Sequence, residues 1–449
     1  MHAHPPLPAS IAPPATRLHG PAPGGKRRGT IAPAAAGLAP VTAPDERPAP
    51  GRGPFLALMA LAVVLSLTTW FSATAIAAEL RHAWGLSPGA AGWLTNAVQL
   101  GFVAGALASS LVNLADVVRL NRLMAAAATL AAAVNLVPLL DPGAGGAIAA
   151  RFVTGVALAG VYPPALKLTA TWFRRGRGLA LGLLIGAPPL GSSLPHLVRA
   201  LGGGLDWRLV VLVTSAASLV AAAIFTGAIR EGPYPFARAT MDLRQVGAVF
   251  RNRPLMLASL GYFGHMWELY AMWGWFLAFA TAAGETGDAA LAGRASLLTF
   301  AVVAAGMPGC LLGGWLSDRI GRTLTTAGLL LVSGSCALAI GFVFDGPNWA
   351  FVAVALVWGV AIVGDSAQFS AAATELADQR FVGTALALQL GLGFALTVVT
   401  IWLVPIAADA LGGWRWAFLL LVPGPLVGAA AMLALRRRPE AAALAGGLR

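Results

Sequence analysis

Long apolar runs separated by short polar gaps dominate the chain between residues 55 and 436. A helix needs about 20 mostly apolar residues to cross a bilayer, and twelve runs reach that length. They lie at residues 55–78, 90–112, 120–140, 147–170, 179–199, 208–229, 255–280, 294–317, 323–344, 349–372, 382–407 and 415–436. The pattern therefore predicts an all-α polytopic membrane protein with twelve transmembrane helices.

The long polar gap at residues 230–254 divides these runs six and six. We therefore expect an N-terminal six-helix bundle at 55–229, a linker at 230–254 and a C-terminal six-helix bundle at 255–436. Residues 1–54 are rich in Pro, Ala and Gly, a composition typical of a disordered tail. Residues 437–449 form a short C-terminal tail.

The two halves repeat each other at a nearly constant offset of roughly 200 positions. Asp116 aligns with Asp318, and Gly155 aligns with Gly359. Because isolated glycine matches arise easily by chance, the constant offset across several anchors carries the argument. It predicts parallel repeats, with two bundles related by a pseudo-two-fold axis along the membrane normal.

Composition agrees with this architecture. The chain is 58% hydrophobic and 11% charged, whereas soluble domains carry about 25% charged residues. The formal charge of +12 does not indicate nucleic-acid binding, because Lys and Arg gather in the gaps between runs and at the chain ends. Positive charge collects in cytoplasmic loops, which predicts a multi-pass protein of a bacterial-type inner membrane with both termini in the cytoplasm.

A charged loop between the eighth and ninth runs carries the most specific motif, Gly314-Trp-Leu-Ser-Asp318-Arg319-Ile-Gly321-Arg322. Gly321 permits a tight turn, Asp318 can accept hydrogen bonds at a helix N-terminus, and the arginines can pair with carboxylates. A partial copy between the second and third runs keeps Asp116, Arg119 and Arg122 but lacks the glycine.

On these residues the chain resembles the major facilitator superfamily from Phe55 to Arg438. The loop is similar to that family's Gly-x-Leu-x-Asp-Arg-x-Gly-Arg signature, and Arg151-x-x-x-Gly155 is similar to its Arg-x-x-x-Gly motif. The resemblance implies that both loops latch the two bundles together during transport. The alternative is that they are ordinary positively charged loops.

Ionisable side chains inside membrane segments are costly and normally face a cavity or a partner. His265 and Glu268 lie three positions apart in the seventh run, on one helical face. Glu268 is the candidate proton carrier, and His265 is placed to share its proton. The alternative is a buried structural pair among neighbouring tryptophans.

Three further sets of polar residues are candidates for the site. Asp365 and Gln368 in the tenth run predict either a polar patch on a cavity wall or a kink that Asp365 stabilises. Arg151 in the fourth run has three possible roles: it reaches the bilayer surface, it binds an anion, or it pairs with Glu268. Asn96 and Gln99 in the second run either bind a ligand or join helices.

Together these residues predict a secondary active transporter that works by alternating access around a site at the bilayer midplane. No Gly-x-x-x-x-Gly-Lys-Ser/Thr loop is present, so proton coupling rather than ATP is expected to drive it. A small organic anion is the favoured substrate. The alternatives are a proton-driven exporter of drugs or metabolites and a non-transporting membrane sensor.

No catalytic set points to an enzyme, and the sequence suggests no cofactor. The two cysteines, Cys310 and Cys336, lie inside apolar runs and are expected to be packing residues rather than metal ligands. The expected partners are the lipid bilayer, the substrate and protons, with no nucleic acid. A monomer is the expected oligomeric state.

Overall fold

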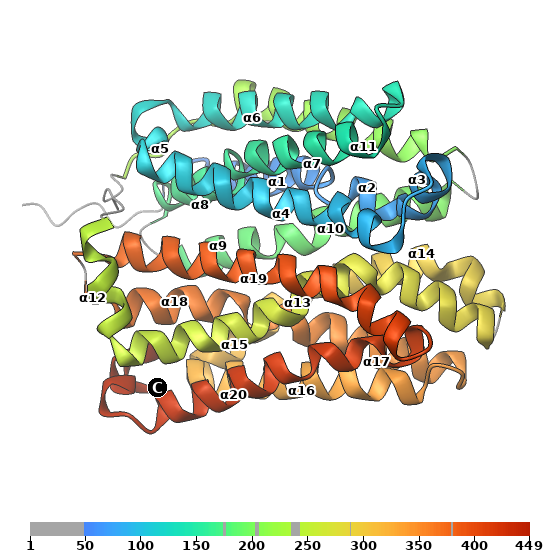
Figure 1. The fold of residues 1–449 in the computed structure, drawn as a ribbon. Helices are drawn as coiled ribbons and strands as arrows, with labels where there is room; N and C mark the ends of the chain where they lie inside the picture. The colour runs from blue at the N-terminus through green and yellow to red at the C-terminus, as the bar shows by residue number, and fades with distance from the viewer. Residues whose placement is uncertain (1–48, 174–176, 203–205, 235–242, 288, 379) are drawn as a thin grey trace, which may run out of the picture. The chain divides into compact units, whose positions relative to one another are not determined.

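The computed structural model describes residues 49–449 apart from 174–176, 203–205, 235–242, 288 and 379. Within those ranges the chain folds into helices and contains no strand (Figure 1). The helices are α1 (Arg52–Leu67), α2 (Ser72–Ala75), α3 (Ala77–Trp84), α4 (Pro88–Leu111), α5 (Leu114–Val117), α6 (Leu120–Asn135), η1 (Val137–Leu140), α7 (Gly143–Ala159), α8 (Tyr162–Ala170), α9 (Arg177–Ile185), α10 (Ala187–Leu201), α11 (Arg208–Gly227), η2 (Leu243–Gln245), α12 (Val246–Arg251), α13 (Arg253–Thr286), α14 (Ala289–Ala304), α15 (Gly306–Ile320), α16 (Arg322–Phe342), α17 (Asn348–Gly364), α18 (Ser366–Leu376), α19 (Val382–Ala410), η3 (Trp414–Leu421), α20 (Pro423–Arg436) and η4 (Pro439–Gly447). Almost all of the predicted tail at 1–54 and the middle of the predicted linker lie outside the described residues.

Ten helical stretches in the described part of the chain are long and apolar enough to cross a membrane. They correspond to ten of the twelve predicted runs. The first run contains only the shorter apolar helix α1, which is followed by the short helices α2 and α3. The seventh lies inside α13, whose 34 residues carry His265 and Glu268. An all-helical chain with many membrane-length helices is therefore confirmed.

Several predicted runs are interrupted within their length. The first breaks at residues 68–71, the fourth between α7 and α8, and the tenth at Asp365 between α17 and α18. Proline follows the break in the fourth run, where Pro163 and Pro164 occupy the first turn of α8 and donate no backbone N–H. Broken helices are tolerated at membrane depth only where the freed backbone groups are buried in protein or line a cavity. These breaks therefore mark the parts of the fold where polar chemistry is expected.

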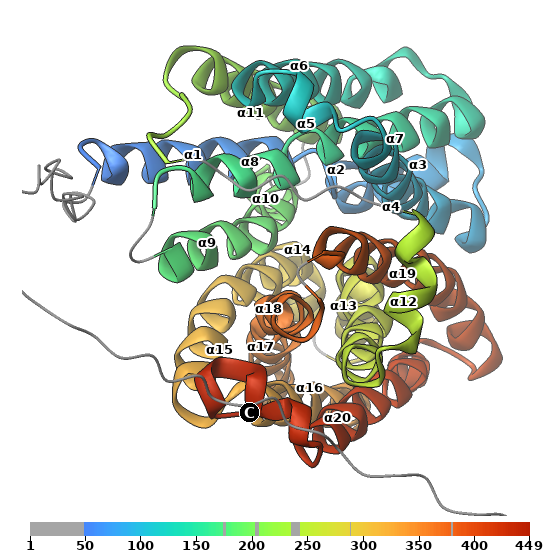
Figure 2. The ribbon, with the colours of Figure 1, turned by 90° about the vertical axis from the view of Figure 1, so that its left-hand side faces the viewer.

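Helices of each sequence half pack mainly on one another. In the first half α4 packs on α7 and α6 on α11; in the second half α13 packs on α20 and α16 on α17. The two halves meet where α4 contacts α19 and where α10 contacts α14. Figures 1 and 2 show α4 beside α19 in both views. The polar and aromatic side chains on these facing helices are the ones that can form a shared site.

Small residues let the helices within each half approach closely. A Cβ added to Gly309 would lie 2.2 Å from the carbonyl oxygen of Val360, and one added to Gly105 would lie 2.8 Å from that of Val156. Small residues at such contacts are typical of helix packing in membranes, where close backbone approach replaces the hydrophobic effect as the source of stability.

The C-terminal segment folds back on the protein instead of extending away from it. Ala441 and Leu444 in η4 are fully buried, and the backbone N–H of Ala445 donates to Glu375 Oε2 at 3.2 Å. The segment after α11 docks in a related way, because the N–H of Gly232 donates to Thr171 Oγ1 at 2.8 Å. Each docked segment thus follows the last long helix of one half.

Candidate functional site

Glu268 is buried inside the second half of the chain. Its Oε1 accepts hydrogen bonds from Ser333 Oγ on α16 at 2.7 Å and from Trp358 Nε1 on α17 at 2.6 Å. Its side chain is 1% exposed. Both donors are neutral, and in the described part of the chain no cationic group pairs with this carboxylate. The same donors suit the protonated acid, whose carbonyl oxygen can also accept them.

His265 lies one helical turn from Glu268 but has different partners. Its Nδ1 is 2.9 Å from Asp365 Oδ1, and its Nε2 is 2.8 Å from Ser366 Oγ. Asp365 Oδ1 makes no aligned hydrogen bond within the described ranges, so its contact with His265 is a close approach off the axis of the ring N–H. The pair joins α13 to the break between α17 and α18. His265 is therefore a partner of Asp365 in this structure rather than of Glu268.

Arg151 is buried and does not reach the bilayer surface, since its side chain is 2% exposed. It donates to the carbonyl oxygens of Thr69 at 2.8 Å, Leu94 at 3.3 Å and Trp70, and to Ser72 Oγ at 3.1 Å. Thr69 and Trp70 lie in the break of the first run, so the guanidinium binds carbonyl groups that no helix satisfies. None of the acidic side chains in the described residues pairs with it, and Glu268 is engaged elsewhere.

Six aromatic rings from both halves meet at the interface between them. This interface ring cluster consists of Trp70, Phe71, Phe102, Tyr270, Trp273 and Phe394. The Trp70 ring lies 4.9 Å from Phe102 on α4, 5.9 Å from Tyr270 on α13 and 6.1 Å from Phe394 on α19, between centroids. The sequence did not predict the cluster, because its members are spread over four separate helical runs.

The predicted polar pair of α4 faces the same interface. Asn96 donates from Nδ2 to the carbonyl oxygen of Val398 on α19 at 3.2 Å. Gln99 is fully buried, and neither its amide nitrogen nor its amide oxygen has a hydrogen-bond partner within the described ranges. Three positions further on, Phe102 contacts Phe394 at 4.9 Å. Gln99 therefore lies between two direct contacts of α4 with α19.

Within the loop motif, Arg322 makes the most hydrogen bonds. Its Nε and Nη2 donate to the two carboxylate oxygens of Glu375 at 2.7 and 2.6 Å, and its Nη1 donates to Gln368 Oε1 at 2.7 Å. Gln368 is thus placed with Arg322, away from the contact between His265 and Asp365. Gly321 has the positive φ of +87° that its turn requires, in a region that favours glycine.

The other residues of the motif have fewer contacts. A Cβ added to Gly314 would meet no atom within 4 Å, and the guanidinium carbon of Arg319 lies 3.7 Å from the ring centroid of Trp315. Asp318 is exposed without a partner in the described ranges. In the partial copy Arg119 and Arg122 are exposed. The side chain of Asp116 lies outside the described residues, so the structure does not test its predicted role.

A separate surface loop pairs two oppositely charged residues between α18 and α19. Arg380 Nη2 donates to Asp378 Oδ2 at 2.6 Å. Hydrogen bonds from the side chain and backbone of Arg380 lower the pKa of Asp378 to about 2. Both groups are well exposed, so this pair is a local loop contact and not part of the buried site.

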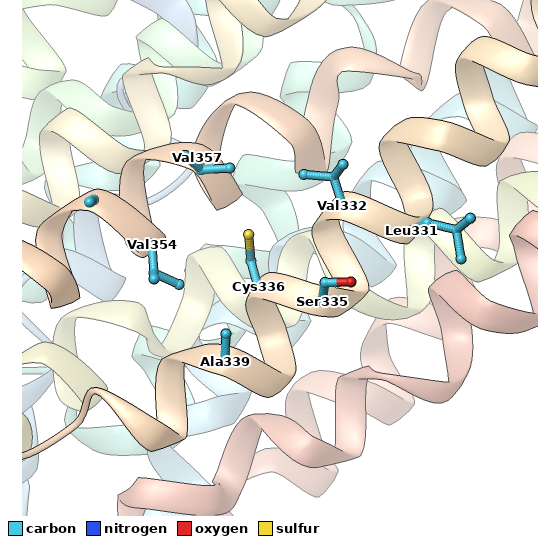
Figure 3. A pocket seen from close by; sticks show the side chains of 8 residues that line it. Leu331, Val332, Ser335, Cys336, Ala339, Val354 and Val357 are labelled. Atoms are coloured by element: carbon cyan, nitrogen blue, oxygen red, sulfur yellow. The ribbon is translucent and has the colours of Figure 1, made fainter.

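Two hollows lie away from the interface ring cluster. One, of about 450 Å³, is an apolar groove between α16 and α17, with the side chains of Ser335 and Cys336 among its lining residues (Figure 3). The other, of about 490 Å³, lies beside η4 and is lined by Arg251, Arg253 and Glu375 among others. The apolar groove offers too few polar groups to orient a polar solute.

The sequence profile of the Major Facilitator Superfamily matches residues 58–396, so the chain belongs to that superfamily of membrane transporters and is not an enzyme. It is 26% identical over 280 residues to the 3-(3-hydroxy-phenyl)propionate transporter of Escherichia coli, a match covering 60% of this chain and 65% of that protein. It is 23% identical over 320 residues to the niacin transporter NiaP of Acinetobacter baylyi, covering 62% of this chain and 68% of that protein. A third relative, the MFS-type transporter pynF of Aspergillus niger, is 26% identical over 253 residues, covering 54% of this chain and 55% of that protein. In such matches the chain spans between about half and two thirds of the relative.

Solved structures agree on the fold over a longer stretch. A D-xylose–proton symporter superposes with a TM-score of 0.67 at 15% identity, covering 86% of this chain and 98% of that one. A bacterial homologue of the human lysosomal transporter Spinster, in an inward-facing occupied conformation, superposes with a TM-score of 0.67 at 15% identity. The match covers 86% of this chain and 97% of that one. At this identity the likeness establishes the fold alone.

Proposed function

We propose that this protein is a proton-coupled secondary transporter of a small organic anion. Its twelve membrane spans form two six-helix bundles related by a pseudo-two-fold axis, which expose an interface site alternately to each side. Both termini lie in the cytoplasm of a cell with a bacterial-type inner membrane, and the protein acts as a monomer. The repeated glycine contacts of α4 with α7 and of α15 with α17 support the two-fold relationship.

The buried guanidinium of Arg151 is the observation that supports an anionic substrate. A cation inside a membrane protein pairs with an acid or with backbone carbonyls, and in the described residues Arg151 pairs with neutral acceptors, so its positive charge is not neutralised by an acid. It donates to the backbone of Trp70, whose ring belongs to the interface ring cluster. An anion beside these rings would experience a positive charge that no acid offsets. The names of two relatives, transporters of 3-(3-hydroxy-phenyl)propionate and of niacin, agree with this substrate class.

Two buried acids supply candidate proton sites. Among the described residues Glu268 accepts from neutral donors only, so it can bind and release a proton without losing an ion pair. Asp365 contacts His265 and lies at the break between α17 and α18. A change in the charge of Asp365 therefore alters the contacts at the break where the tenth span can bend. In our proposal Glu268 carries the coupled proton, and the pair of His265 and Asp365 adjusts the conformation.

The loop motif serves as the latch at the cytoplasmic end. Arg322 binds Glu375 and Gln368 on α18, which ties the start of α16 to the end of the tenth span. Because α18 also contacts α9 of the other half, the position of the latch depends on whether the two halves are in contact. The proposed role of Asp318 and of the partial copy at Asp116, Arg119 and Arg122 is to complete this latch in another conformation.

The test is uptake of radiolabelled carboxylates into proteoliposomes under an imposed pH gradient, with protein-free liposomes as the control for passive entry. Accumulation of one carboxylate, abolished when a protonophore collapses the gradient, is the expected result. Accumulation of an organic cation in exchange for protons would instead make the protein an exporter of the alternative class. Accumulation that persists after the gradient is collapsed would remove proton coupling.

A further inference from the structure

Two tryptophan N–H groups of α13 have backbone acceptors. Trp275 Nε1 donates to the carbonyl oxygen of Ile401 at 2.8 Å, and Trp267 Nε1 donates to that of Leu420 at 2.9 Å. Trp70 Nε1 and Trp273 Nε1 differ, because both are buried without a hydrogen-bond partner in the described part of the chain. An unpaired buried N–H costs about 1–3 kcal/mol. Its presence at two rings of one cluster therefore calls for a functional reason.

Gln99 adds a third unpaired group on the same interface. Its side chain is fully buried with both amide atoms unbonded. It lies one helical turn before Phe102, whose ring is 4.9 Å from that of Trp70. The interface ring cluster is thus bordered by three buried side chains with unbonded donors, Trp70, Trp273 and Gln99, while the unbonded amide oxygens on the same face of α4 are those of Gln99 and Asn96. Donors outnumber acceptors, which suits a ligand rich in acceptor oxygens.

We propose that the interface ring cluster and Gln99 form the substrate site, and that its ligand is a carboxylate carried on a planar aromatic ring. This inference rests on the proposed function and specifies its substrate class. The indole N–H groups of Trp70 and Trp273 and the amide of Gln99 donate to the carboxylate. Arg151 binds the backbone carbonyl of Trp70, so its positive charge lies near the carboxylate without contacting the ligand.

The ring of the substrate fits the cluster for a geometric reason. In this structure the rings pack on one another, with Tyr270 at 5.3 Å from Phe394 and 5.5 Å from Trp273. When the two halves separate, the rings of Trp70 and Phe102 lose their partners on α13 and α19. An aromatic substrate ring restores ring–ring contacts to Trp70 and Phe102. Offset or edge-to-face ring pairs contribute about 0.5–1.5 kcal/mol beyond the free energy of the area that they bury. A saturated ring of the same size lacks this contribution.

The experiment measures binding of benzoate and of cyclohexanecarboxylate to the purified full-length protein by calorimetry. We expect benzoate to bind roughly tenfold more tightly, the ratio that corresponds to about 1.4 kcal/mol. Trp70→Phe and Gln99→Leu keep the packing but remove donors, and each should weaken benzoate binding roughly fivefold, the worth of one hydrogen bond. Trp267→Phe makes the same chemical change at a ring outside the cluster and should leave benzoate binding unchanged.

The outcomes separate this inference from the proposed function. Equal binding of the two acids, with proton-driven carboxylate uptake intact, overturns the aromatic site and leaves the transporter proposal standing. Unchanged benzoate affinity in both Trp70→Phe and Gln99→Leu overturns the donor assignment. Failure of every carboxylate to bind or to be taken up overturns both proposals. Each variant is first shown to be monodisperse by gel filtration, and if Trp70→Phe does not fold, Trp273→Phe takes its place.

Discussion

Gly359 approaches Val302 so closely that a Cβ on the glycine would lie 2.0 Å from the carbonyl oxygen of Val302. The first half contains the same contact, because a Cβ on Gly155 would lie 2.1 Å from the carbonyl oxygen of Val98. Both pairs join a broken span to its neighbour, α17 to α14 and α7 to α4, at one constant offset of roughly 200 positions along the chain. The glycines thus hold corresponding helices of each half at corresponding positions.

Replacing Gly359 with Ala should separate α17 from α14 and lower thermal stability. No real Cβ tolerates a backbone oxygen at 2.0 Å, so the helices must shift, and overpacking of this kind costs about 1–3 kcal/mol or more. Gly328→Ala is the matched control, since Gly328 lies within α16 with open space around it. Alanine there should be neutral or slightly stabilising. Equal melting temperatures of the two purified variants would contradict the packing argument.

Glu268→Gln should abolish proton-driven accumulation while leaving the fold intact. The amide oxygen of Gln can still accept from Ser333 and Trp358, but the side chain can no longer exchange a proton. The measurement is proton entry into proteoliposomes, reported by a pH-sensitive dye during substrate uptake. Glu285→Gln, an exposed position on the same helix, is the control. Normal proton entry in Glu268→Gln would transfer the coupling role to Asp365.

Arg151→Met should destabilise the break in the first run. The buried carbonyl oxygen of Trp70 loses its guanidinium donor, and leaving such a group unpaired costs about 1–3 kcal/mol. Arg151→Lys keeps the charge but cannot reach all of the acceptors, so its melting temperature should fall between those of the wild type and Arg151→Met. Arg208→Met, at an exposed arginine paired with Asp206, should change little. A stable Arg151→Met variant that still binds carboxylates would remove Arg151 from the proposed function.

Arg322 and Glu375 should show measurable coupling in a double-mutant cycle of Arg322→Lys and Glu375→Gln. Their two parallel hydrogen bonds hold side chains that are only 18% and 28% exposed, so we expect a coupling of about 1 kcal/mol in thermal unfolding. The same cycle at Arg380 and Asp378, where the side chains are 84% and 36% exposed, should give no measurable coupling. Similar values for the two pairs would argue against a latch at Arg322.

The sequence alone predicted the membrane-length helices, and it suggested an internal repeat and marked Arg151 and Glu268 as charged candidates inside apolar runs. Hydrophobic length and charge are read directly along the chain, and a charge inside an apolar run is conspicuous because burying it is costly. The Gly155 and Gly359 anchors were also visible, since a repeat needs only spacing and residue identity to be detected.

The tertiary structure alone decided which side chains meet. His265 and Glu268 share a helical face, yet one contacts Asp365 and the other contacts Ser333 and Trp358. Gln368 faces Arg322, and the interface ring cluster gathers residues from Trp70 to Phe394. Helical periodicity fixes the face of one helix but not the neighbour that the face meets. Those neighbours depend on packing and on breaks in the helices, which bring together residues that are hundreds of positions apart.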